Sequence, residues 1–485
     1  MNKIIILNNK KCHFVSENEQ LIKKLRQKLS FKQTGVEYTA AFQNGWSGYT
    51  FLMSKNNKFD FGLINIVKSY LTELNESYEV IDKRPPKEIS KPIDISNRLK
   101  ELKLSPRDHQ IRIASITDSY DKGIVRAATG SGKTLATALI TAKLNKPTII
   151  YVIGLDLLKQ FHTLFSSIFD EPIGWIGNGT CDVQRITIAS IWTIGKALNV
   201  DKVVDDEEFS SDEKLEPSNS EKIISLLKST KVHIFDESHI VTCNTIAEIY
   251  KAIDPEYIYG FSGTPYRDDN SDLLITGILG EKVIDVSASE LIEKGLLAQP
   301  FIKFVTVPKM PGLERSYHSV YRDYIVENEE RNNLILKHLK ELLDKNYTPL
   351  VLFKQIKHGK ILAKLFEENN INFGMLYGND SLDKRNEVKE QLNNDEINVI
   401  LASTIYDIGV DIPKLNSLIL SGSGKSSVKS LQRIGRVVRS FPGKKIAAIV
   451  DFYDQAHYVK QHSLKRFEIY SSESGFKVIK SKEMK

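Results

Sequence analysis

The chain has 485 residues, of which 41% are hydrophobic and 26% are charged, proportions typical of a globular protein in water. A chain of this length exceeds one ordinary domain, so two or three domains are expected. It contains no apolar run long enough to cross a bilayer and no signal-peptide cleavage site near its start, so neither a membrane partner nor secretion is expected.

The three cysteines, Cys12, Cys181 and Cys243, lie far apart in the chain and form no C-x-x-C pair. Neither a zinc site nor a disulfide framework is therefore expected. Free thiols fit the reducing interior of a cell, so a cytoplasmic location is expected.

The net charge of +6 is unevenly distributed along the chain. Residues 201–221 hold nine acids against two lysines, a net of −7, so the rest of the chain carries +13. The acidic segment lacks the apolar residues for a core and is expected to be a flexible insert. The basic remainder suits a polyanionic partner such as nucleic acid, although a solvated surface rich in lysine would give the same charge.

Residues 1–92 are expected to form a small α+β accessory domain, with a Pro-rich linker from Lys83 to Pro92. Strands are predicted at Ile4–Leu7, Cys12–Val15, Tyr38–Phe42 and Gly48–Met53, and helices at Glu17–Leu29 and Leu63–Leu74. A set of basic and aromatic residues could contact nucleic acid, including a duplex: Lys23, Lys24, Arg26, Trp46 and Tyr49. The alternative is a solvated helix face beside packed aromatic rings.

From residue 93 onward, short β-like runs alternate with helical segments. In residues 93–300 the predicted strands are Gly123–Arg126, Thr148–Ile153, Ile186–Ala189, Lys231–Phe235 and Tyr257–Phe261. In residues 301–485 they are Leu350–Phe353, Asn372–Met375, Asn398–Leu401, Ser417–Leu420 and Ala447–Val450. This alternation predicts two α/β units with parallel, doubly wound sheets. Residues Lys477–Lys485 are expected to form a frayed tail.

A phosphate-binding loop is predicted at Ala127–Thr134, between a strand and an apolar helical pattern. The pattern G-x-x-x-x-G-K-[ST] has Ala127 in place of its first glycine, but Gly130 and Gly132 still allow the backbone to curl around an anion. Lys133 is placed to reach the β- and γ-phosphates of ATP, and the Thr134 hydroxyl to bind Mg²⁺. Such a motif alone could also be a chance Gly-rich turn.

Asp236 and Glu237 follow an apolar strand, the position of the second half of an NTPase site. Asp236 would hold Mg²⁺, and Glu237 would orient and deprotonate the attacking water. A lone acidic turn at a strand end is common, but here a phosphate loop precedes it in the same unit.

Two arginines three positions apart, Arg436 and Arg439, lie in a basic segment of the second unit and would share one face of a helix. Two guanidinium groups suit the charge on a transferring phosphoryl group. A basic helix of this kind is otherwise most often a solvated face.

Together these residues make the chain similar to superfamily 2 helicases and translocases, which have two RecA-like domains. Segments resembling their motifs occur in order at Ala128–Thr134, Asp236–His239, Ser262–Pro265, Ala402–Asp411 and Gln432–Arg439. The shorter motifs Ia and Ib resemble Leu155–Phe161 and Thr187–Ser190, although Gly154 to Asp156 departs from the usual start of motif Ia. The fold expected is therefore two tandem RecA-like parallel-sheet domains preceded by a small α+β domain.

The resemblance implies an ATP-dependent motor with Mg²⁺ and assigns a role to each matching residue. Those implied to bind nucleotide are Arg107, Gln110, Thr129, Gly130, Ser131, Gly132, Lys133, Thr134, Gly409 and Asp411, with Thr134 and Asp236 also binding the metal. Those implied in hydrolysis are Lys133, Asp236, Glu237, Gln432, Arg436 and Arg439. Contacts to the nucleic-acid backbone are implied for Lys159, Gln160, Ser190 and Thr404, and coupling of the two sites for His239, Ser262 and Thr264.

A narrower resemblance, carried by Leu291–Pro300 and Glu327–Asn332, is to phage UvsW-type helicases. It implies branch migration, fork reversal or unwinding of branched DNA, in the host cytoplasm if the chain is phage-encoded. An RNA helicase, the motor subunit of a restriction system and an ATP-gated nucleic-acid clamp remain alternatives. No protein partner is indicated. ATPase rates with forked DNA, single strands, duplex and RNA would separate these functions.

Overall fold

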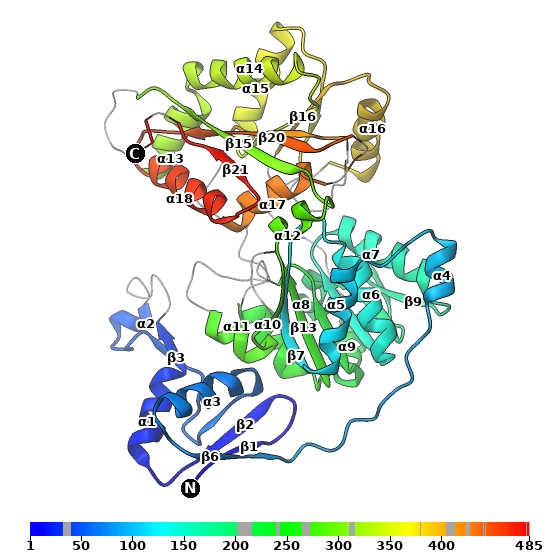
Figure 1. The fold of residues 1–485 in the computed structure, drawn as a ribbon, viewed down its shortest axis with the longest axis vertical. Coiled ribbons are helices and arrows are strands. Elements are labelled where there is room, and N and C mark those ends of the chain that lie inside the picture. Colours follow the sequence, from blue (N-terminus) through cyan, green and yellow to red (C-terminus); the bar gives the residue numbers. More distant parts are fainter. Residues whose placement is uncertain are drawn as a thin grey trace. The chain divides into compact units, whose positions relative to one another are not determined.

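In the computed structural model, the described part of the chain is built on three larger sheets and one two-stranded sheet (Figure 1). The residues described are 1–32, 40–200, 216–238, 243–263, 272–309, 316–378, 380–403, 412, 414–422, 427–439, 441, 443–481 and 483–484. They divide into two compact units, 1–127 with 132–285, and 128–131 with 286–485.

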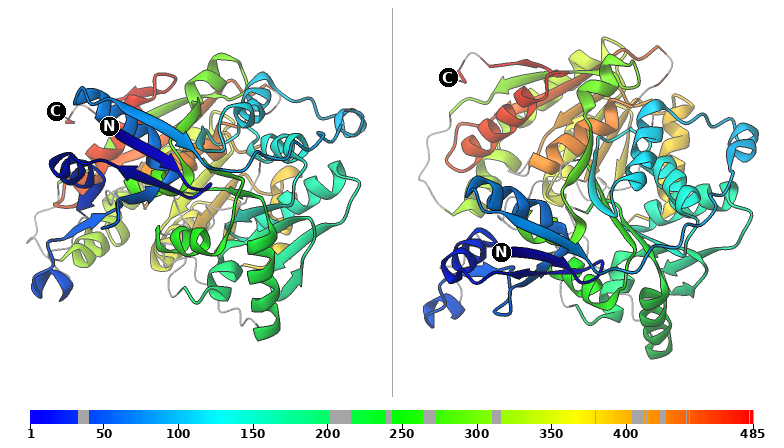
Figure 2. Two further views of the ribbon diagram at one scale, coloured as in Figure 1. Left: turned by 90° about the horizontal axis from the view of Figure 1, so that it is seen from below. Right: turned by 60° about the horizontal axis from the view of Figure 1, so that its bottom comes forward.

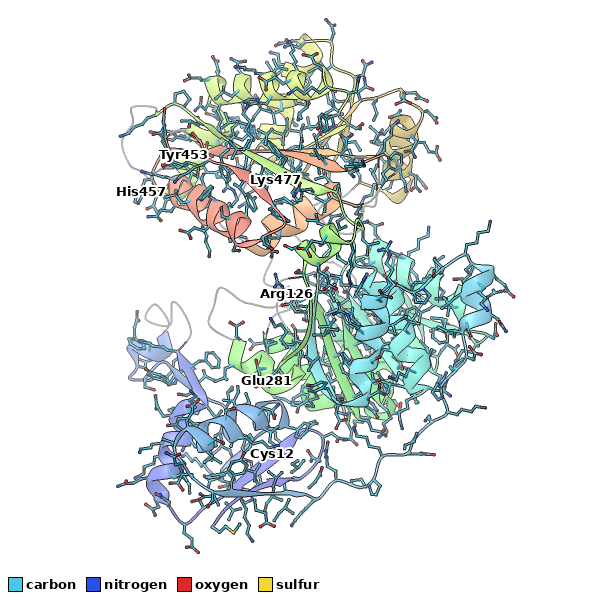
Figure 3. All side chains as sticks on the ribbon, in the orientation of Figure 1. Cys12, Arg126, Glu281, Tyr453, His457 and Lys477 are labelled. Carbon is cyan, nitrogen blue, oxygen red and sulfur yellow. The ribbon has the colours of Figure 1, made fainter. Side chains whose placement is uncertain are left out.

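The first unit begins with a small α+β subdomain, as predicted (Figure 2). Its four-stranded sheet has the order β5-β2-β1-β6, formed by β1 (Asn2–Ile6), β2 (Lys11–Val15), β5 (Lys58–Asp60) and β6 (Tyr78–Asp82). Helices α1 (Glu19–Lys28) and α3 (Ile64–Glu73) complete its core with the strands, and Cys12, labelled in Figure 3, is buried there. The short strands β3 (Ser30–Lys32) and β4 (Tyr49–Phe51) form a separate antiparallel pair.

The strand predicted at Tyr38–Phe42 is wrong in its described part. Ala40–Gln43 forms the short helix α2, while residues 38 and 39 lie outside the described residues. Two consecutive alanines favour a helical turn over an extended strand, because alanine has the highest helix propensity of all residues.

The subdomain is joined to the following α/β domain by a buried polar contact. The Lys122 ammonium donates to the Tyr250 hydroxyl at 2.9 Å and to the Ile278 carbonyl at 3.2 Å. The Tyr250 hydroxyl in turn donates to the Lys10 carbonyl at 2.9 Å, which carries the contact into the subdomain. Burial lowers the pKa of Lys122 to about 7.

Close backbone packing strengthens the same junction. A Cβ added to Gly62 would lie 2.2 Å from the Thr276 carbonyl oxygen, so only glycine allows this approach. Arg84 in the linker donates to Asp121 at 2.8 Å. Removing residues 1–92 would break the hydrogen bond from Tyr250 to Lys10 and remove the Arg84 partner of Asp121. Point substitutions are therefore a cleaner probe of the subdomain than truncation.

The first α/β domain contains an eight-stranded sheet with the order β10-β9-β11-β8-β12-β13-β7-β14. From β9 to β7 in this order, neighbouring strands are parallel, whereas β10 pairs antiparallel with β9. Its strands are β7 (Lys122–Ala127), β8 (Thr148–Val152), β9 (Ile173–Gly177), β10 (Thr180–Asp182), β11 (Ile186–Ser190), β12 (Val232–Phe235), β13 (Tyr257–Ser262) and β14 (Lys282–Val286). Its helices are α4 (Ser96–Glu101), α5 (Asp108–Ser115), α6 (Lys133–Leu144), α7 (Leu155–Ile168), α8 (Ile191–Ala197), α9 (Pro217–Ser229), α10 (Cys243–Ala252) and α11 (Asp272–Leu279). Because the central strands run parallel, their carboxyl ends meet at one edge of the sheet.

The flexible insert predicted at residues 201–221 is wrong in its last part, which belongs to helix α9. Residues 201–215 lie outside the described residues, but the segment from Pro217 onward is helical rather than flexible. Pro217 occupies the first turn, where its missing N–H costs nothing. The helix is retained because Ile223, Leu226 and Leu227 are buried against the domain.

Deleting residues 201–215 should leave a folded ATPase, since this segment has too few apolar residues to contribute to a core. Extending the deletion to residue 221 removes the first turn of α9 and should cost on the order of 1–2 kcal/mol from lost hydrogen bonds. Thermal unfolding of both deletions against the full chain measures the difference. Equal loss of stability in the two deletions would show that residues 201–215 themselves support the fold.

The second unit contains a seven-stranded sheet with the order β17-β18-β16-β19-β20-β15-β21, in which all neighbouring strands are parallel. Its strands are β15 (Gln299–Thr306), β16 (Pro349–Phe353), β17 (Phe373–Leu376), β18 (Val399–Ser403), β19 (Ser417–Leu420), β20 (Ile446–Tyr453) and β21 (Lys477–Ile479). Its helices are α12 (Ala288–Glu293), α13 (Tyr317–Tyr321), α14 (Glu329–Leu343), α15 (Ile356–Glu368), α16 (Leu382–Asn393), α17 (Ser427–Val437) and α18 (Val459–Ser472). The structure thus confirms the predicted class of two parallel-sheet α/β domains after a small α+β domain.

The frayed tail predicted at Lys477–Lys485 is wrong for its first residues. Lys477, labelled in Figure 3, opens strand β21, which pairs with β15 through Phe301, Ile302 and Lys303. Backbone hydrogen bonds to a neighbouring strand fix this segment, and its three residues carry too little periodicity to reveal a strand from sequence. Across the described residues, the structure contains no helix of the length and apolar character that crossing a bilayer requires.

Candidate active site

The predicted phosphate loop connects β7 to α6. Gly130 has φ of 87° and Gly132 has φ of 78°, values at which a side chain would strain the backbone. The Ser131 N–H donates to the Ala128 carbonyl at 3.1 Å, which closes the turn before α6 begins at Lys133. The N-terminus of a helix directs free N–H groups and a partial positive charge at an anion, so this segment has the form of a phosphate site.

Lys133 meets the two predicted acidic residues in the first α/β domain. Its ammonium lies 2.5 Å from Glu237 Oε1 and 4.0 Å from Asp236 Oδ1. All three side chains are largely buried. A cation paired with two carboxylates can transfer to a polyphosphate, because the polyphosphate carries more negative charge.

The strand ends hold the acidic pair in place. The Asp236 N–H donates to the Tyr151 carbonyl at 2.9 Å, and the Ser238 N–H donates to the Phe261 carbonyl at 3.0 Å. Between them, Glu237 has φ of 48°, a left-handed conformation that costs free energy for a residue with a side chain. The hydrogen bonds on both sides maintain this conformation, which is typical of a functional position.

Asp236 fits a divalent cation. It is 4% exposed, burial raises the pKa of its carboxyl group, and its Oδ1 atom forms no hydrogen bond to any described residue. A buried oxygen of this kind is a hard ligand suited to Mg²⁺, as is the hydroxyl of Thr134 at the start of α6. Asp236 and Thr134 are thus the residues that would hold the ion.

Gln110 is buried on helix α5, beside the phosphate loop. Its amide oxygen accepts from the Arg107 N–H at 2.9 Å, and its amide nitrogen donates to the Gly132 carbonyl at 3.3 Å. A Cβ on Gly132 would lie 2.2 Å from that nitrogen. The structure therefore places Gln110 against the loop. To contact adenine, as the resemblance implies, the Gln110 amide would have to give up its hydrogen bonds to Arg107 and Gly132.

The remaining residues assigned from sequence are distributed over both units. Ser262 and Ser190 are buried at the carboxyl ends of β13 and β11, whereas Lys159 and Gln160 are exposed on α7. His239, Thr264, Thr404, Gly409 and Asp411 lie outside the described residues, as does the side chain of Gln432. The roles expected for all of them stay predictions.

Arg436 and Arg439 do not share a helical face. Helix α17 ends at Val437, so Arg436 is helical while Arg439 forms an isolated antiparallel bridge with Leu297. The Val438 carbonyl accepts from the Ala298 N–H at 2.8 Å, which pulls the chain out of the helix. The helix thus ends before Arg439 because a distant segment hydrogen-bonds to the backbone there, although the spacing of the two arginines is helical.

A buried support behind the acidic pair was not predicted from sequence. The Tyr151 hydroxyl lies 2.8 Å from His233 Nδ1, and the Tyr151 ring stacks on Phe235 at a centroid distance of 4.3 Å. Burial lowers the pKa of His233 to about 3, so the imidazole is neutral at physiological pH. These residues connect β8 to β12 just before Asp236, and only their cross-strand pairing reveals them.

The fold and site define an ATPase with a phosphate loop followed by a second α/β domain. Two family models match the chain, one described as the res subunit of type III restriction enzymes over residues 103–267, the other as the helicase conserved C-terminal domain over residues 333–441. The chain belongs to the superfamily 2 helicases and is an ATP-hydrolysing member of that group.

Individual relatives are distant. Putative helicase 22 of a Sulfolobus islandicus filamentous virus is 27% identical over 373 residues, and the match covers 72% of this chain and 64% of the viral protein. The ATP-dependent DNA helicase uvsW of phage T4 is 23% identical, with 96% of each chain covered. Dbp5 of Saccharomyces cerevisiae, solved with RNA and ADP BeF3, shares the fold with a TM-score of 0.54 at 14% identity, covering 80% of this chain and 93% of Dbp5.

Proposed function

We propose that this chain is an ATP-dependent DNA translocase that unwinds or migrates branched DNA. The observation that carries the proposal is the attachment of an accessory subdomain to the ATPase domain through the hydrogen bond from the Tyr250 hydroxyl to the Lys10 carbonyl. The match to the T4 DNA helicase supports it, because that match extends over nearly the whole chain, including the accessory subdomain. The basic charge outside the acidic insert suits a phosphate backbone.

In the proposed mechanism, Lys133 leaves Glu237 when ATP binds and contacts the β- and γ-phosphates. Glu237, released from its ion pair, orients the attacking water and accepts its proton. Asp236 and Thr134 would hold Mg²⁺, which supplies neutralisation of the phosphate charge. Serine residues at the ends of β11 and β13, Ser190 and Ser262, are proposed to link this site to the DNA strand.

The domain boundaries expected from sequence remain part of the proposal: accessory domain and linker at 1–92, first RecA-like domain at 93–300 and second at 301–485. The accessory subdomain would hold one arm of a junction while the motor domains move along another. A motor that only moves along a single strand does not need a second DNA-binding domain. Branched DNA is therefore the substrate that this organisation favours.

Forked or four-way DNA should therefore stimulate ATP hydrolysis more strongly than single-stranded DNA, duplex DNA or RNA. Steady-state turnover with each ligand, at equal nucleotide concentration and fixed salt, measures this preference. A protein that contacts about 6–10 phosphates should lose roughly 10³- to 10⁵-fold in affinity between about 50 and 200 mM salt. Stimulation by RNA alone would replace this proposal with an RNA helicase, and equal stimulation by single strands and junctions would leave a general translocase.

A further inference from the structure

Three exposed aromatic rings lie within six residues of one another in the accessory subdomain. Trp46, Tyr49 and Phe51, here called the aromatic face, are 36%, 38% and 41% exposed. Figure 1 shows β3 and α2 set apart from the four-stranded sheet of the subdomain. Exposed large side chains that are contiguous on a surface can mark a binding site.

The strand pairing explains why two of the rings point outward. Strand β4 pairs antiparallel with β3, with Tyr49 opposite Lys32 and Phe51 opposite Ser30. Phe31, one position out of phase, is buried. Since side chains alternate along a strand, Tyr49, Phe51 and Lys32 share the outer side of this pair, and the centroids of the two rings lie 6.4 Å apart.

Two cations, Arg26 and Lys32, lie beside the aromatic face. The Arg26 guanidinium lies 5.0 Å from the centroid of the Phe51 ring, and the Lys32 ammonium lies 5.2 Å from that of Phe42. Between positions 20 and 32 there are five basic residues and no acid: Lys23, Lys24, Arg26, Lys28 and Lys32. Among the described residues none of these five forms an ion pair with a carboxylate, so their charge is available to a polyanion.

We propose that the aromatic face binds unpaired bases of DNA by stacking, with the surrounding cations on the phosphates. This proposal rests on the proposed function and specifies what the accessory subdomain holds. In a duplex both faces of a base are already stacked, so exposed rings gain little there. Unpaired bases offer a free face, and rings interleaved with cations are the usual means of binding them. The subdomain would therefore hold the unpaired strand at a branch point rather than a duplex arm.

The test compares forks whose unpaired arm carries bases with forks whose arm is abasic. Replacing Trp46, Tyr49 or Phe51 by alanine should weaken binding to the intact arm roughly 5- to 100-fold for each ring that stacks. The same variants should bind the abasic fork as wild type does, because that arm keeps its phosphates but has no bases. Fluorescence anisotropy of labelled forks, at one salt concentration and without nucleotide, measures both affinities.

Two matched controls separate stacking from charge and from general exposure. Tyr120→Ala removes a 45% exposed ring from the first α/β domain and should change neither affinity. The double variant Lys23→Ala and Lys24→Ala should weaken binding to both forks alike, since it removes only cations. Thermal unfolding midpoints equal to that of wild type establish that the ring variants are folded.

Tryptophan fluorescence gives a second measurement, which detects stacking in a protein that still binds DNA. The chain has three tryptophans, of which Trp175 donates to the Gly177 carbonyl in the first α/β domain. Stacking of a base on Trp46 should quench its emission on addition of oligothymidine, and Trp46→Phe should abolish that quenching while retaining affinity.

Ring variants that bind both forks as wild type does, or that lose affinity for both forks equally, would overturn the stacking proposal. Quenching that persists in Trp46→Phe would overturn it as well. These binding measurements do not depend on ATP hydrolysis. A failure of junction DNA to stimulate turnover would therefore count against the proposed function only. The binding measurements would still test whether the aromatic face stacks on bases.

Discussion

Replacing Glu237 by glutamine should lower kcat for ATP hydrolysis about 10²- to 10⁴-fold, the usual contribution of a positioned general base. Glutamine retains the shape of the side chain but neither accepts the proton of the attacking water nor carries charge. The affinity for ATP should stay equal or rise. Lys133 is paired with Glu237 at 2.5 Å, and the substitution spares ATP the cost of breaking that pair.

The contrast with Lys133→Ala sharpens this prediction, because that variant should lose affinity for ATP as well as turnover. Glu248→Gln, which removes a carboxylate from an exposed surface pair with Lys251, is the matched control and should leave both parameters unchanged. Steady-state kinetics together with equilibrium binding of a fluorescent ATP analogue measure the two effects. Near-normal kcat in well-folded Glu237→Gln would remove Glu237 from the catalytic role.

Replacing Arg466 by methionine should destabilise the second unit by about 3–5 kcal/mol, the typical cost of leaving one partner of a buried ion pair behind. Arg466 on α18 donates to both oxygens of Asp451 on β20, each at 2.8 Å, and Asp451 is fully buried. The Tyr470 hydroxyl donates to Asp451 as well, at 3.2 Å. Without the guanidinium, a buried carboxylate would keep only two donors, the Tyr470 hydroxyl and the Phe452 N–H.

Adding Asp451→Asn to Arg466→Met should recover part of this loss, because the buried negative charge is removed while an acceptor for Tyr470 remains. Lys384→Met breaks an exposed pair with Glu387 and should cost no more than about 1 kcal/mol. Denaturant unfolding of the three variants measures the differences. A loss for Arg466→Met as small as that for Lys384→Met would show that the buried pair contributes little net stability.

Local patterns in the chain were enough to predict the phosphate loop, the acidic pair and most central strands. The loop depends on glycines, a lysine and a threonine that are neighbours in the chain, so its geometry follows from local conformation. The strands of both large sheets are short, almost wholly buried apolar runs such as β8 and β16, and their alternation with helices indicates a parallel sheet.

Errors occurred where a segment's conformation depends on a partner far away in the chain. Arg439 is not helical because Leu297 pairs with it and the Ala298 N–H donates to the neighbouring Val438 carbonyl. Strand β21 exists because β15 offers an edge for pairing, and α9 is helical because its apolar residues are buried against the domain. Strands β9 and β10 were likewise missed. Two of the five residues of β9 are glycines, which are depleted in strands, and β10 has only three residues, too few to establish a period.

The sequence by itself determined the class of this protein, an ATPase motor with two α/β domains, because its motifs are local and occur in order. Only the tertiary structure decided which groups meet. Lys133 and Glu237 are 104 positions apart, and parallel strands bring their ends to one edge. Lys122 is buried against Tyr250 of the same domain, and Tyr250 in turn contacts Lys10 of the accessory subdomain. Such contacts form only when distant segments pack, since burial and pairing are properties of the folded chain and not of any local segment.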